Sequence, residues 1–465
     1  MAYKVVKFGG SNLKDIFGIK NILNAITNYD QPLIIVVSAF YGVTNGLIEA
    51  IDLSLKGKLR LNSYINELYA EKLKIIEETV SSEIVIQEFK KELEKRLDKL
   101  KGFFLGINYI KDVPPFVYDE VLSYGERLSS LVLFYILKYA GIDCEEALPE
   151  DIGLITDGEF KNATINFELT PLYLKENLRK DKTYVVPGFY GVSEEGRITL
   201  LGRGGSDYSA AAIAACLNAE SLDLWKDVKG FLSADPNIVE DAVKVEYLTY
   251  KEAAELAYFG SKILHPRTPE PLAKQNIPIR ILNIYDAPNG IIPLTIINGK
   301  RKISEGVVKS VSYSDDFGLL KLHGSGVGIK PGILAKSTVV LDNAGINIKS
   351  VITSQTTINI LLSSDDLIKA KRIIAGKDIH GINEVEIEDR ISLIAAVGEG
   401  LTLRSGIAGR IFTAVARKGI NVKIISFGAS SVAMYFIVDQ KDRNETVSQI
   451  HHEFFVHEFC CEACV

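Results

Sequence analysis

The sequence predicts an α/β fold in which a doubly wound, mostly parallel sheet is followed by two smaller α/β modules. Over residues 1–300, short apolar segments are each followed by a polar or glycine-rich loop and then a helix, the order typical of doubly wound sheets. In the last third, GILA at 332–335 recurs as GIAG at 406–409, and GINIK at 345–349 recurs as GINVK at 419–423. Both pairs are 74 residues apart (406 − 332 and 419 − 345), so the chain contains two copies of one small module.

These patterns divide the 465 residues into three parts. We expect the large sheet in residues 1–300, with a helical annex at about 45–140 whose charges form solvated faces. The first small module is expected at 301–388, and the second, with a tail, at 389–465. Two copies are too few for a solenoid, so a paired regulatory unit is the simpler interpretation.

The first strand is expected at Tyr3–Phe8, a short apolar segment, and a helix follows to about Tyr29. Lys7 puts a compact positive charge near the carboxyl end of this strand. Gly9 and Gly10 follow, and glycines let the backbone approach a ligand closely. Because ligands of doubly wound sheets gather beyond the carboxyl ends of the strands, this loop is expected at a binding site.

The second strand is expected at Leu33–Val37 and leads into a polar loop that contains Ser38 and Thr44. Most of residues 45–140 are helical by periodicity and charge pairing. Glu126 lies inside an otherwise apolar helix of this region. A lone glutamate is usually at the surface, but this one is surrounded in sequence by core-type residues.

The stretch Leu200–Ala215 joins a glycine-rich loop to an alanine-rich helix. Free backbone N–H groups and the positive end of the helix dipole favour an anion there. Arg203 lies between glycines, and its planar guanidinium suits a carboxylate or a phosphate. Ser206 is expected to cap the helix and Asp207 to stand in its first turn. On its own, this pattern is equally typical of an ordinary helix N-terminus.

Three further strands are expected at Thr183–Val192, Ser221–Trp225 and Pro278–Asn283. Lys226 and Asp227 follow the second of these directly, so they fall beyond a strand's carboxyl end. The sequence has no Gly-x-x-x-x-Gly-Lys-Ser/Thr segment, which excludes a P-loop.

The composition excludes several classes of protein. A net charge of −6 argues against nucleic acid as the main partner. No apolar run approaches ~18 residues and no signal peptide is recognisable, so we expect neither a membrane span nor secretion. Five cysteines in so long a chain do not indicate a disulfide framework, so the cytoplasm is expected. We expect no metal site at the terminal cluster, because no second ligand pair has zinc-finger spacing; its residues are His457, Cys460, Cys461 and Cys464.

Six ordered segments carry a family resemblance: KFGGSN (7–12), SAFYGVTN (38–45), YGERLSS (124–130), LGRGGSDYSAA (201–211), KDVKGFLSADP (226–236) and FGSKILHPRT (259–268). Together they resemble motifs of the aspartate kinases of the amino-acid kinase superfamily. The repeated modules resemble the pair of ACT domains, ferredoxin-like βαββαβ units, that ends such chains. The resemblance covers nearly the whole sequence and implies a monofunctional enzyme.

The resemblance implies transfer of the ATP γ-phosphate to the β-carboxylate of L-aspartate, which gives 4-phospho-L-aspartate. This is the first step of the lysine, threonine and methionine pathway. A carboxylate is already ionised near neutrality, so the reaction needs no general base. It needs two anions held in line and their charge neutralised. Mg²⁺ would be carried mainly by the ATP phosphates.

The resemblance also implies residue roles. Lys7 and Lys262 would converge on the transferring phosphoryl group, with Asp207 holding both lysines in place. Arg203 would bind the substrate's α-carboxylate, and Glu126 its α-ammonium group. The remaining pocket residues would be Ser38, Thr44, Phe189 and Ser206. Nucleotide contacts would come from Gly9, Gly10, Gly204, Gly205, Lys226, Asp227 and Lys262. An amino-acid effector would meet Gly332, Ile333, Leu334, Asn347 and Gln355.

The chain departs from the family on the nucleotide loop. Lys226 stands where the family has threonine, Leu232 where it has tyrosine, and Asn237 where it has arginine. Losing the arginine removes a charged hydrogen bond worth roughly 1.5–3 kcal/mol, so we expect ATP to bind more weakly or differently. Lys226 could offset that loss.

A further departure concerns the effector. Lys349 and Gln355 stand where lysine-inhibited relatives have acidic residues, and a like charge should repel a lysine ammonium group. Threonine, bound through Asn347 and Gln355, or no effector at all, remain open. ACT domains generally pair across subunits, so a homodimer is expected.

Two other functions stay open. The altered nucleotide loop beside intact ACT modules would also suit an amino-acid sensor whose kinase part has lost turnover. A related kinase could instead act on another carboxylate or on a carbamate. Glu126 opposite Arg203 favours a free α-amino acid, because an N-acylated substrate would leave the glutamate buried and unpaired.

Overall fold

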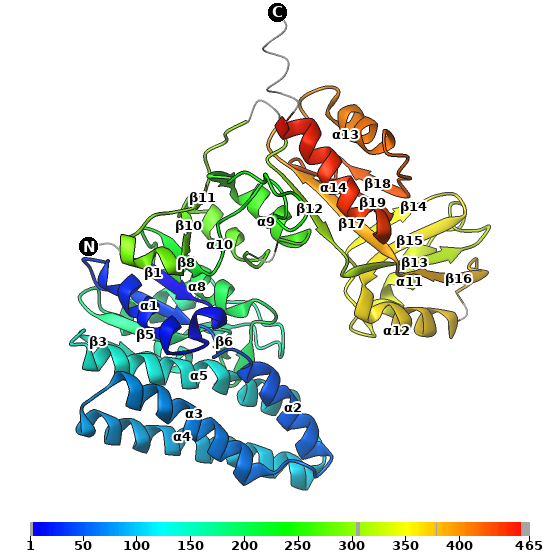
Figure 1. The fold of residues 1–465 in the computed structure, drawn as a ribbon. Helices are drawn as coiled ribbons and strands as arrows, with labels where there is room; N and C mark the ends of the chain where they lie inside the picture. The colour runs from blue at the N-terminus through cyan, green and yellow to red at the C-terminus, as the bar shows by residue number, and fades with distance from the viewer. Residues whose placement is uncertain (1–2, 262, 304–306, 378, 457–465) are drawn as a thin grey trace, which may run out of the picture. The chain divides into compact units, whose positions relative to one another are not determined.

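The computed structural model describes residues 3–261, 263–303, 307–377 and 379–456, which form two compact units (Figure 1). The first unit comprises Met1–Phe231, Lys244–Ala257 and Lys262–Lys302. The second comprises Leu232–Val243, Tyr258–Ser261 and Ile303–Val465. Two short segments from within the first 300 residues therefore fold with the second unit.

The first unit is built on an eight-stranded sheet of order β3-β5-β2-β1-β8-β10-β11-β9. Neighbouring strands are parallel except for the pair β10 and β11, which confirms the predicted doubly wound, mostly parallel sheet. Strands β2 and β8 flank β1 on opposite sides, so the carboxyl ends of β1 and β8 meet at a topological switch point. The strands are β1 (Val5–Phe8), β2 (Ile34–Val37), β3 (Cys144–Glu146), β5 (Thr183–Pro187), β8 (Leu222–Lys226), β9 (Tyr247–Thr249), β10 (Ile279–Asn283) and β11 (Thr295–Asn298).

A small second sheet in this unit contains β4 (Ile155–Thr156), β6 (Tyr190–Ser193) and β7 (Ile198–Leu200). The expectation of one strand over 183–192 was wrong, because β5 and β6 belong to different sheets. The chain bends between them at Gly188 and Phe189. Phe189 has a φ of +73°, and a Cβ at Gly188 would lie 2.9 Å from Ser206 Cβ. This bend brings the chain against the start of a helix that carries site residues.

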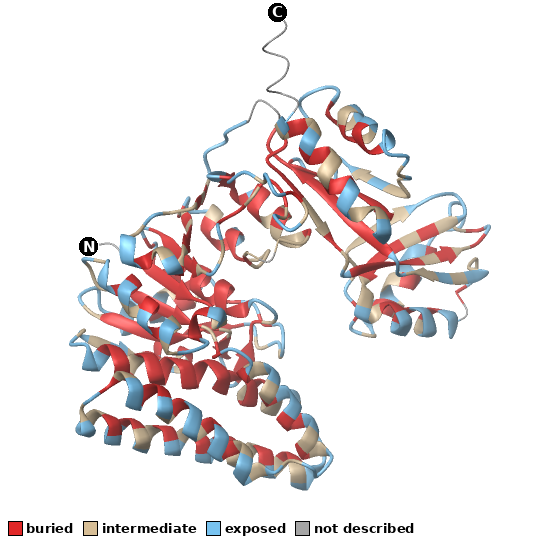
Figure 2. Ribbon diagram, in the orientation of Figure 1, coloured by how far each residue is buried: buried red, intermediate tan, exposed pale blue. Residues whose placement is uncertain are grey.

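Helix α5 (Pro115–Tyr139) is buried along most of its length (Figure 2). One side contacts β2, β3 and β5 of the large sheet, and another contacts α3 and α4. It is buried on several sides, which explains how Glu126 can lie among apolar residues. The helices of this region are α2 (Val43–Leu55), α3 (Leu61–Thr79), α4 (Glu83–Ile110) and α5.

The other helices of the first unit cover the sheet or connect its strands. No helix among the described residues is long and apolar enough to cross a lipid bilayer. The remaining helices are α1 (Ile16–Thr27), α6 (Pro149–Ile152), α7 (Thr170–Asn177), α8 (Gly205–Cys216), most of α9 (Tyr250–Tyr258) and α10 (Pro269–Ala273), with 3₁₀ turns at Gly10–Leu13 and Ile284–Asn289.

The second unit contains two antiparallel four-stranded sheets, each packed with helices. This arrangement confirms the two predicted small α/β modules, of which the first has the expected βαββαβ order along the chain. One sheet has the order β14-β15-β13-β16 and the other β12-β17-β19-β18. The first comprises β13 (Phe317–His323), α11 (Ile333–Asp342), β14 (Ser350–Thr353), β15 (Thr357–Ser363), α12 (Ser364–Ala375) and β16 (Glu384–Glu388). The second comprises β12 (Ser310–Ser314), β17 (Ile391–Val397), α13 (Ile407–Ala416), β18 (Ile424–Phe427), β19 (Ala433–Asp439) and α14 (Arg443–His451).

Strand β12 precedes the first module in sequence but belongs to the second sheet. A division at 388/389 would group it with the first module, whereas its register pairs Ser310 with Val397 and Ser314 with Leu393 of β17. After β17 the described chain supplies only β18 and β19, so β12 completes the second sheet. The first module is thus inserted between two neighbouring strands of the other.

The segment Leu232–Val243 is anchored in the second unit. Ala234 and Val239 belong to the apolar core that contains α13, β17 and β19 residues. The Ser233 carbonyl accepts a hydrogen bond from the Val311 backbone at 2.7 Å, and its hydroxyl lies 2.8 Å from the His451 ring. This segment is therefore a structural part of the second unit.

Candidate active site

Lys7, Asp207 and Lys226 form a buried charged cluster at the switch point of the large sheet. Lys7 lies in β1, and Lys226 is the last residue of the adjacent strand β8. Asp207 stands in the first turn of α8, as predicted. Its Oδ1 is 2.5 Å from Lys7 Nζ, and its Oδ2 is 2.8 Å from Lys226 Nζ. One carboxylate is therefore shared by two ammonium groups, and the cluster has one net positive charge.

Burial and mutual attraction oppose each other in this cluster. Burial alone would raise the pKa of Asp207, but Lys226 and Lys7 outweigh it and hold that pKa well below its usual range. Burial lowers the pKa of Lys7, and the charge of Lys226 acts in the same direction, while Asp207 opposes the shift. Asp207 therefore favours the charged form of Lys7.

Glu126 of α5 reaches the same region. The Ser206 hydroxyl donates to its Oε1 at 3.4 Å, and Lys7 is close enough to affect its ionisation. Oε2 has no hydrogen-bond partner among the described residues. Burial raises the pKa of Glu126 to about 8, although backbone hydrogen bonds from Ala39 and Glu126 itself, and to a smaller extent Lys7 and Ser206, oppose the shift. A buried carboxyl group with an unused oxygen can accept a cationic group of a ligand.

The loop after β1 lies against the loop after β2. Gly10 makes this approach possible, because a Cβ there would lie 2.9 Å from the Ala39 carbonyl oxygen. A Cβ at Gly9 would lie 3.7 Å from Lys7 Nζ, so this loop borders the charged cluster. The Gly9 N–H, however, donates to Asn12 Oδ1 at 3.0 Å. Gly9 therefore contributes space beside Lys7, while its N–H is already satisfied.

The glycine-rich loop before α8 differs in one respect from the expectation. The predicted Ser206 cap was wrong: Gly204 is the N-cap residue, with a φ of +71°, and Ser206 lies inside the helix with its hydroxyl on Glu126. A Cβ at Gly204 would lie 2.4 Å from the His265 ring, so tertiary packing selects glycine there. Gly205 is the first helical residue, and Arg203 is exposed on the loop.

Two of the expected pocket residues lie near Glu126 and Ser206, and a third lies at the end of β1. A Cβ at Gly125 would lie 3.5 Å from Thr44 Oγ1, which places this hydroxyl beside the helix turn that carries Glu126. A Cβ at Gly205 would lie 3.0 Å from the Phe189 ring. Ser38 is half-buried, and its N–H donates to the Phe8 carbonyl at the end of β1.

The expected nucleotide residues separate into two groups. Lys226 and Asp227 lie at the end of β8, and the exposed Asp227 accepts a hydrogen bond from the Ser11 hydroxyl at 3.1 Å. Leu232 and Asn237 belong to the segment that folds with the second unit. Lys262 lies outside the described residues, as do His457, Cys460, Cys461 and Cys464.

Two residues that hold the glycine-rich loop were not singled out from the sequence. Arg267 donates to the Leu201 carbonyl at 3.4 Å, and its guanidinium lies 4.2 Å from the Tyr208 ring centroid. Buried Asp119 accepts from the Leu200 backbone N–H at 2.9 Å. Arg267 lies in the segment FGSKILHPRT, one of the six segments that carry the family resemblance, so the sequence could have pointed to it. Asp119 lies outside all six segments.

The expected effector residues differ in exposure. Ile333 is buried in the core of the first small module, so its side chain packs there instead of lining a surface site. Gly332 is the N-cap of α11 with a φ of +85°. Leu334, Asn347 and Gln355 are exposed. Lys349 Nζ lies 5.3 Å from the Tyr258 ring centroid.

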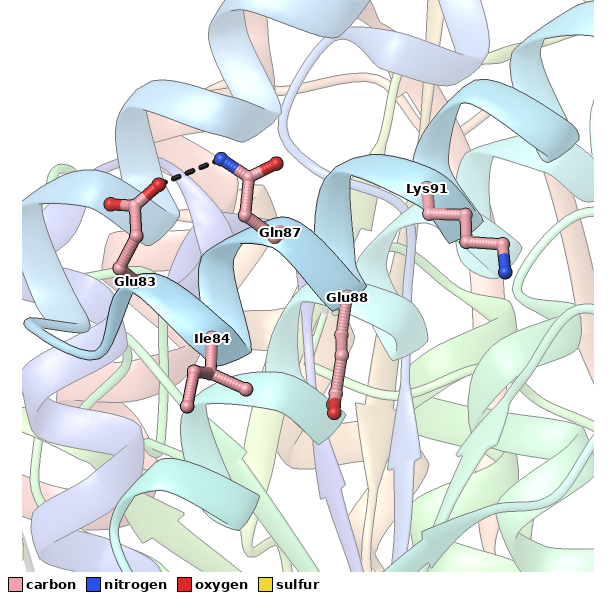
Figure 3. Close-up of a pocket in the computed structure, with 5 residues that line it drawn as sticks. All are labelled: Glu83, Ile84, Gln87, Glu88 and Lys91. Carbon is pink, nitrogen blue, oxygen red and sulfur yellow. Dashed lines mark hydrogen bonds between the residues drawn. The ribbon is translucent and has the colours of Figure 1, made fainter.

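A shallow hollow along α4 does not share the chemistry of the charged cluster (Figure 3). Its lining side chains all come from one helix, and Gln87 donates to Glu83 across a single turn at 2.7 Å. No group of three or more potential His, Cys, Asp or Glu metal ligands occurs in the part of the chain that the structure describes. The lining residues are Glu83, Ile84, Gln87, Glu88 and Lys91.

Comparison with known proteins shows the family of this chain. The family model for the amino acid kinase family matches residues 2–283, and two ACT domain models match residues 312–375 and 394–454. "Aspartokinase 1, chloroplastic" of Arabidopsis thaliana is 31% identical in an alignment that covers 97% of this chain and 80% of the relative. This chain belongs to the aspartokinases of the amino acid kinase family.

Other aspartokinases match over similar lengths. "Lysine-sensitive aspartokinase 3" of Escherichia coli (strain K12) is 27% identical over 97% of this chain and 99% of the relative. The crystal structure of E. coli aspartokinase III with aspartate and ADP (R-state) has a TM-score of 0.82 at 25% identity, covering 97% of this chain and all of that one. The lysine and aspartate complex (T-state) has a TM-score of 0.77 over 97% and 99% of the two chains.

Proposed function

We propose that this aspartokinase transfers the γ-phosphoryl group of ATP to the β-carboxylate of L-aspartate and forms 4-phospho-L-aspartate. The observation that carries the proposal is the buried cluster of Lys7, Asp207 and Lys226 beside Glu126. The names of the related proteins, and the E. coli structure with aspartate and ADP, support these substrates.

The chemistry follows from the charges of the site. The β-carboxylate is ionised near pH 7 and attacks the γ-phosphorus directly, so no residue has to remove a proton. The barrier comes from bringing two anions together, and Lys7 lowers it by neutralising the negative charge of the transferring group. Asp207 keeps Lys7 charged and in place. Lys262 is proposed as a second phosphoryl-facing lysine by resemblance.

The amino acid would bind between Glu126 and Arg203. Glu126 accepts the α-ammonium group, which satisfies the unused Oε2 and stabilises the carboxylate form. Arg203 binds the α-carboxylate from the loop before α8, and Ser38, Thr44, Phe189 and Ser206 complete the pocket.

The nucleotide phosphates would lie near Gly10, Gly204, Gly205 and Asp227. Mg²⁺ fits this site as a companion of ATP, since Asp207 is fully engaged by two ammonium groups and the metal would be held by the phosphate oxygens. It supplies charge neutralisation on those oxygens.

The activity is tested with purified protein, Mg²⁺, ATP and L-aspartate in the presence of hydroxylamine. Formation of a hydroxamate together with ADP is the expected result. Binding of both ligands without ADP release would support the sensor without turnover. Hydroxamate formation with an N-acylated amino acid, but not with aspartate, would support the related kinase.

Replacing Arg203 with alanine should raise the KM for aspartate by roughly 10- to 100-fold, because one charged hydrogen bond to the α-carboxylate is lost. The kcat should change much less, since the guanidinium acts on a part of the substrate that does not react. Steady-state kinetics with aspartate varied at saturating ATP measure this. Arg197→Ala, which alters another exposed arginine, is the control. An unchanged KM for aspartate would exclude Arg203 as the group that binds the α-carboxylate.

We propose that lysine alone does not inhibit this enzyme. The ammonium group of Lys349 lies beside Tyr258, where the first small module would receive an effector by resemblance, and it repels a second ammonium group. Activity assays with lysine, threonine and methionine, singly and in pairs, measure the response. Inhibition of the unaltered enzyme by lysine alone would contradict the prediction.

Assembly and location are also proposals. A homodimer formed through the ACT domains and a place in the cytoplasm, in the pathway toward lysine, threonine and methionine, are consistent with the two modules and the cysteine content. Light scattering of the purified chain gives the oligomeric state directly.

A further inference from the structure

The side chain of Lys226 has an unexpected position for a residue that follows β8. Its ammonium group lies 2.8 Å from Asp207 Oδ2, while Lys7 occupies Oδ1 of the same carboxylate. The family resemblance implies an uncharged threonine at this position, so this second ammonium group is a departure from that pattern.

The charges of the cluster indicate that Lys226 does more than neutralise Asp207. Lys7 and Asp207 form a close pair by themselves, and their charges cancel. Lys226 therefore raises the net charge of the cluster from zero to +1, a surplus that the two lysines around Asp207 share. A surplus cation that is partly desolvated attracts an anionic ligand far more strongly than one in water.

Lys226 is also the better placed of the two lysines to meet a ligand that arrives from solvent. Its side chain is 14% exposed, against 5% for Lys7. It ends β8 at the topological switch point, and Asp227 beside it is exposed. An ammonium group has three donor hydrogens, so a hydrogen bond to Asp207 leaves others for a ligand.

We propose that Lys226 is a second phosphate-binding cation of this site, which pairs with Asp207 in the free enzyme and also binds phosphate oxygens of ATP when the nucleotide is present. This inference rests on the proposed function. By the family resemblance a phosphate-facing arginine is replaced by Asn237, whose amide donates to Asp235 within its own loop, and Lys226 would supply a cation that this substitution removes.

The test measures nucleotide affinity and kinetics of Lys226→Met and Lys226→Thr in the full chain. Calorimetric titration with Mg-ATP, Mg-ADP and AMP should show affinity for the first two falling by roughly 10- to 100-fold, the loss of one charged hydrogen bond, with a smaller change for AMP. The KM for ATP should rise similarly, and the KM for aspartate should stay near its original value. Lys226→Arg, which keeps the charge, should restore most of the ATP affinity.

Lys229→Met is the matched control, because Lys229 is an exposed lysine three residues further along the same loop. Unchanged ATP affinity in Lys226→Met, or equal losses for ATP and AMP, would overturn the inference and leave Lys226 with a structural role. The proposed function fails separately, if the unaltered enzyme forms no hydroxamate from aspartate.

Discussion

Replacing Lys7 with methionine is expected to lower kcat by at least ~100-fold, because the site loses a preorganised charge aimed at the transferring phosphoryl group. Methionine keeps much of the apolar side-chain volume inside β1, so packing around this strand should persist. The KM for aspartate should change little, since Lys7 acts on the phosphoryl group. Hydroxamate formation at saturating substrates measures the loss.

Lys4→Met is the control for this substitution. Lys4 lies just before β1 and makes an ion pair with exposed Glu220 at 3.8 Å, away from the charged cluster. Its replacement should leave kcat within about twofold of the original, as expected for a surface pair. Comparable losses in both variants, or retained turnover in Lys7→Met, would exclude Lys7 from catalysis. A thermal-shift measurement confirms that each variant is folded.

The second large effect concerns Glu126 and pH. Its pKa of about 8 in the free protein means that the carboxyl group is largely protonated at pH 7. Only the carboxylate pairs with the α-ammonium group of aspartate, so binding must displace a proton below pH 8. We expect kcat/KM for aspartate to rise with pH, about tenfold per unit, until it levels off near pH 8.

Glu126→Gln should abolish this rise and increase the KM for aspartate by roughly 10- to 100-fold, because an amide cannot replace the charged partner. Kinetics between pH 6 and about 8.5, below the pH at which aspartate loses its own ammonium proton, give the profile. Glu120→Gln is the control, since Glu120 lies on the same helix and faces Arg127 at 3.8 Å. A pH profile that persists in Glu126→Gln would assign the titration to another group.

The main features of the first unit follow from local patterns in the sequence. Lys7 and Lys226 each stand at the end of a short apolar strand, and parallel strands bring such ends together. The position of Asp207 in the first turn of a helix could also be predicted locally, because a glycine-rich loop precedes it and an alanine-rich run follows it. The family assignment was also within reach, because several motifs occur in a fixed order.

Other features depend on contacts between distant segments, which local patterns do not contain. Ser206 has the chemistry of a cap, yet the cap is Gly204, against which the His265 ring packs, so the helix begins two residues earlier and the serine hydroxyl donates to Glu126. The pairing of Lys226 with Asp207 likewise requires the end of β8 to face α8. Strand β12 joins the second sheet because the described part of the chain after residue 390 supplies only three of its four strands, and the sequence repeat does not show this.

The path of the backbone has a consequence for dissecting this enzyme. The chain passes from one compact unit to the other after Phe231, Val243, Ala257, Ser261 and again after Lys302. A protease cut or a stop codon at residue 302 would leave 232–243 attached to the catalytic fragment while removing the core around Ala234 and Val239. Removing the second unit therefore leaves Ala234 and Val239 in the remaining fragment without the apolar side chains that they pack against. A loss of activity in such a fragment could come from this exposed segment, so it would not measure allosteric control.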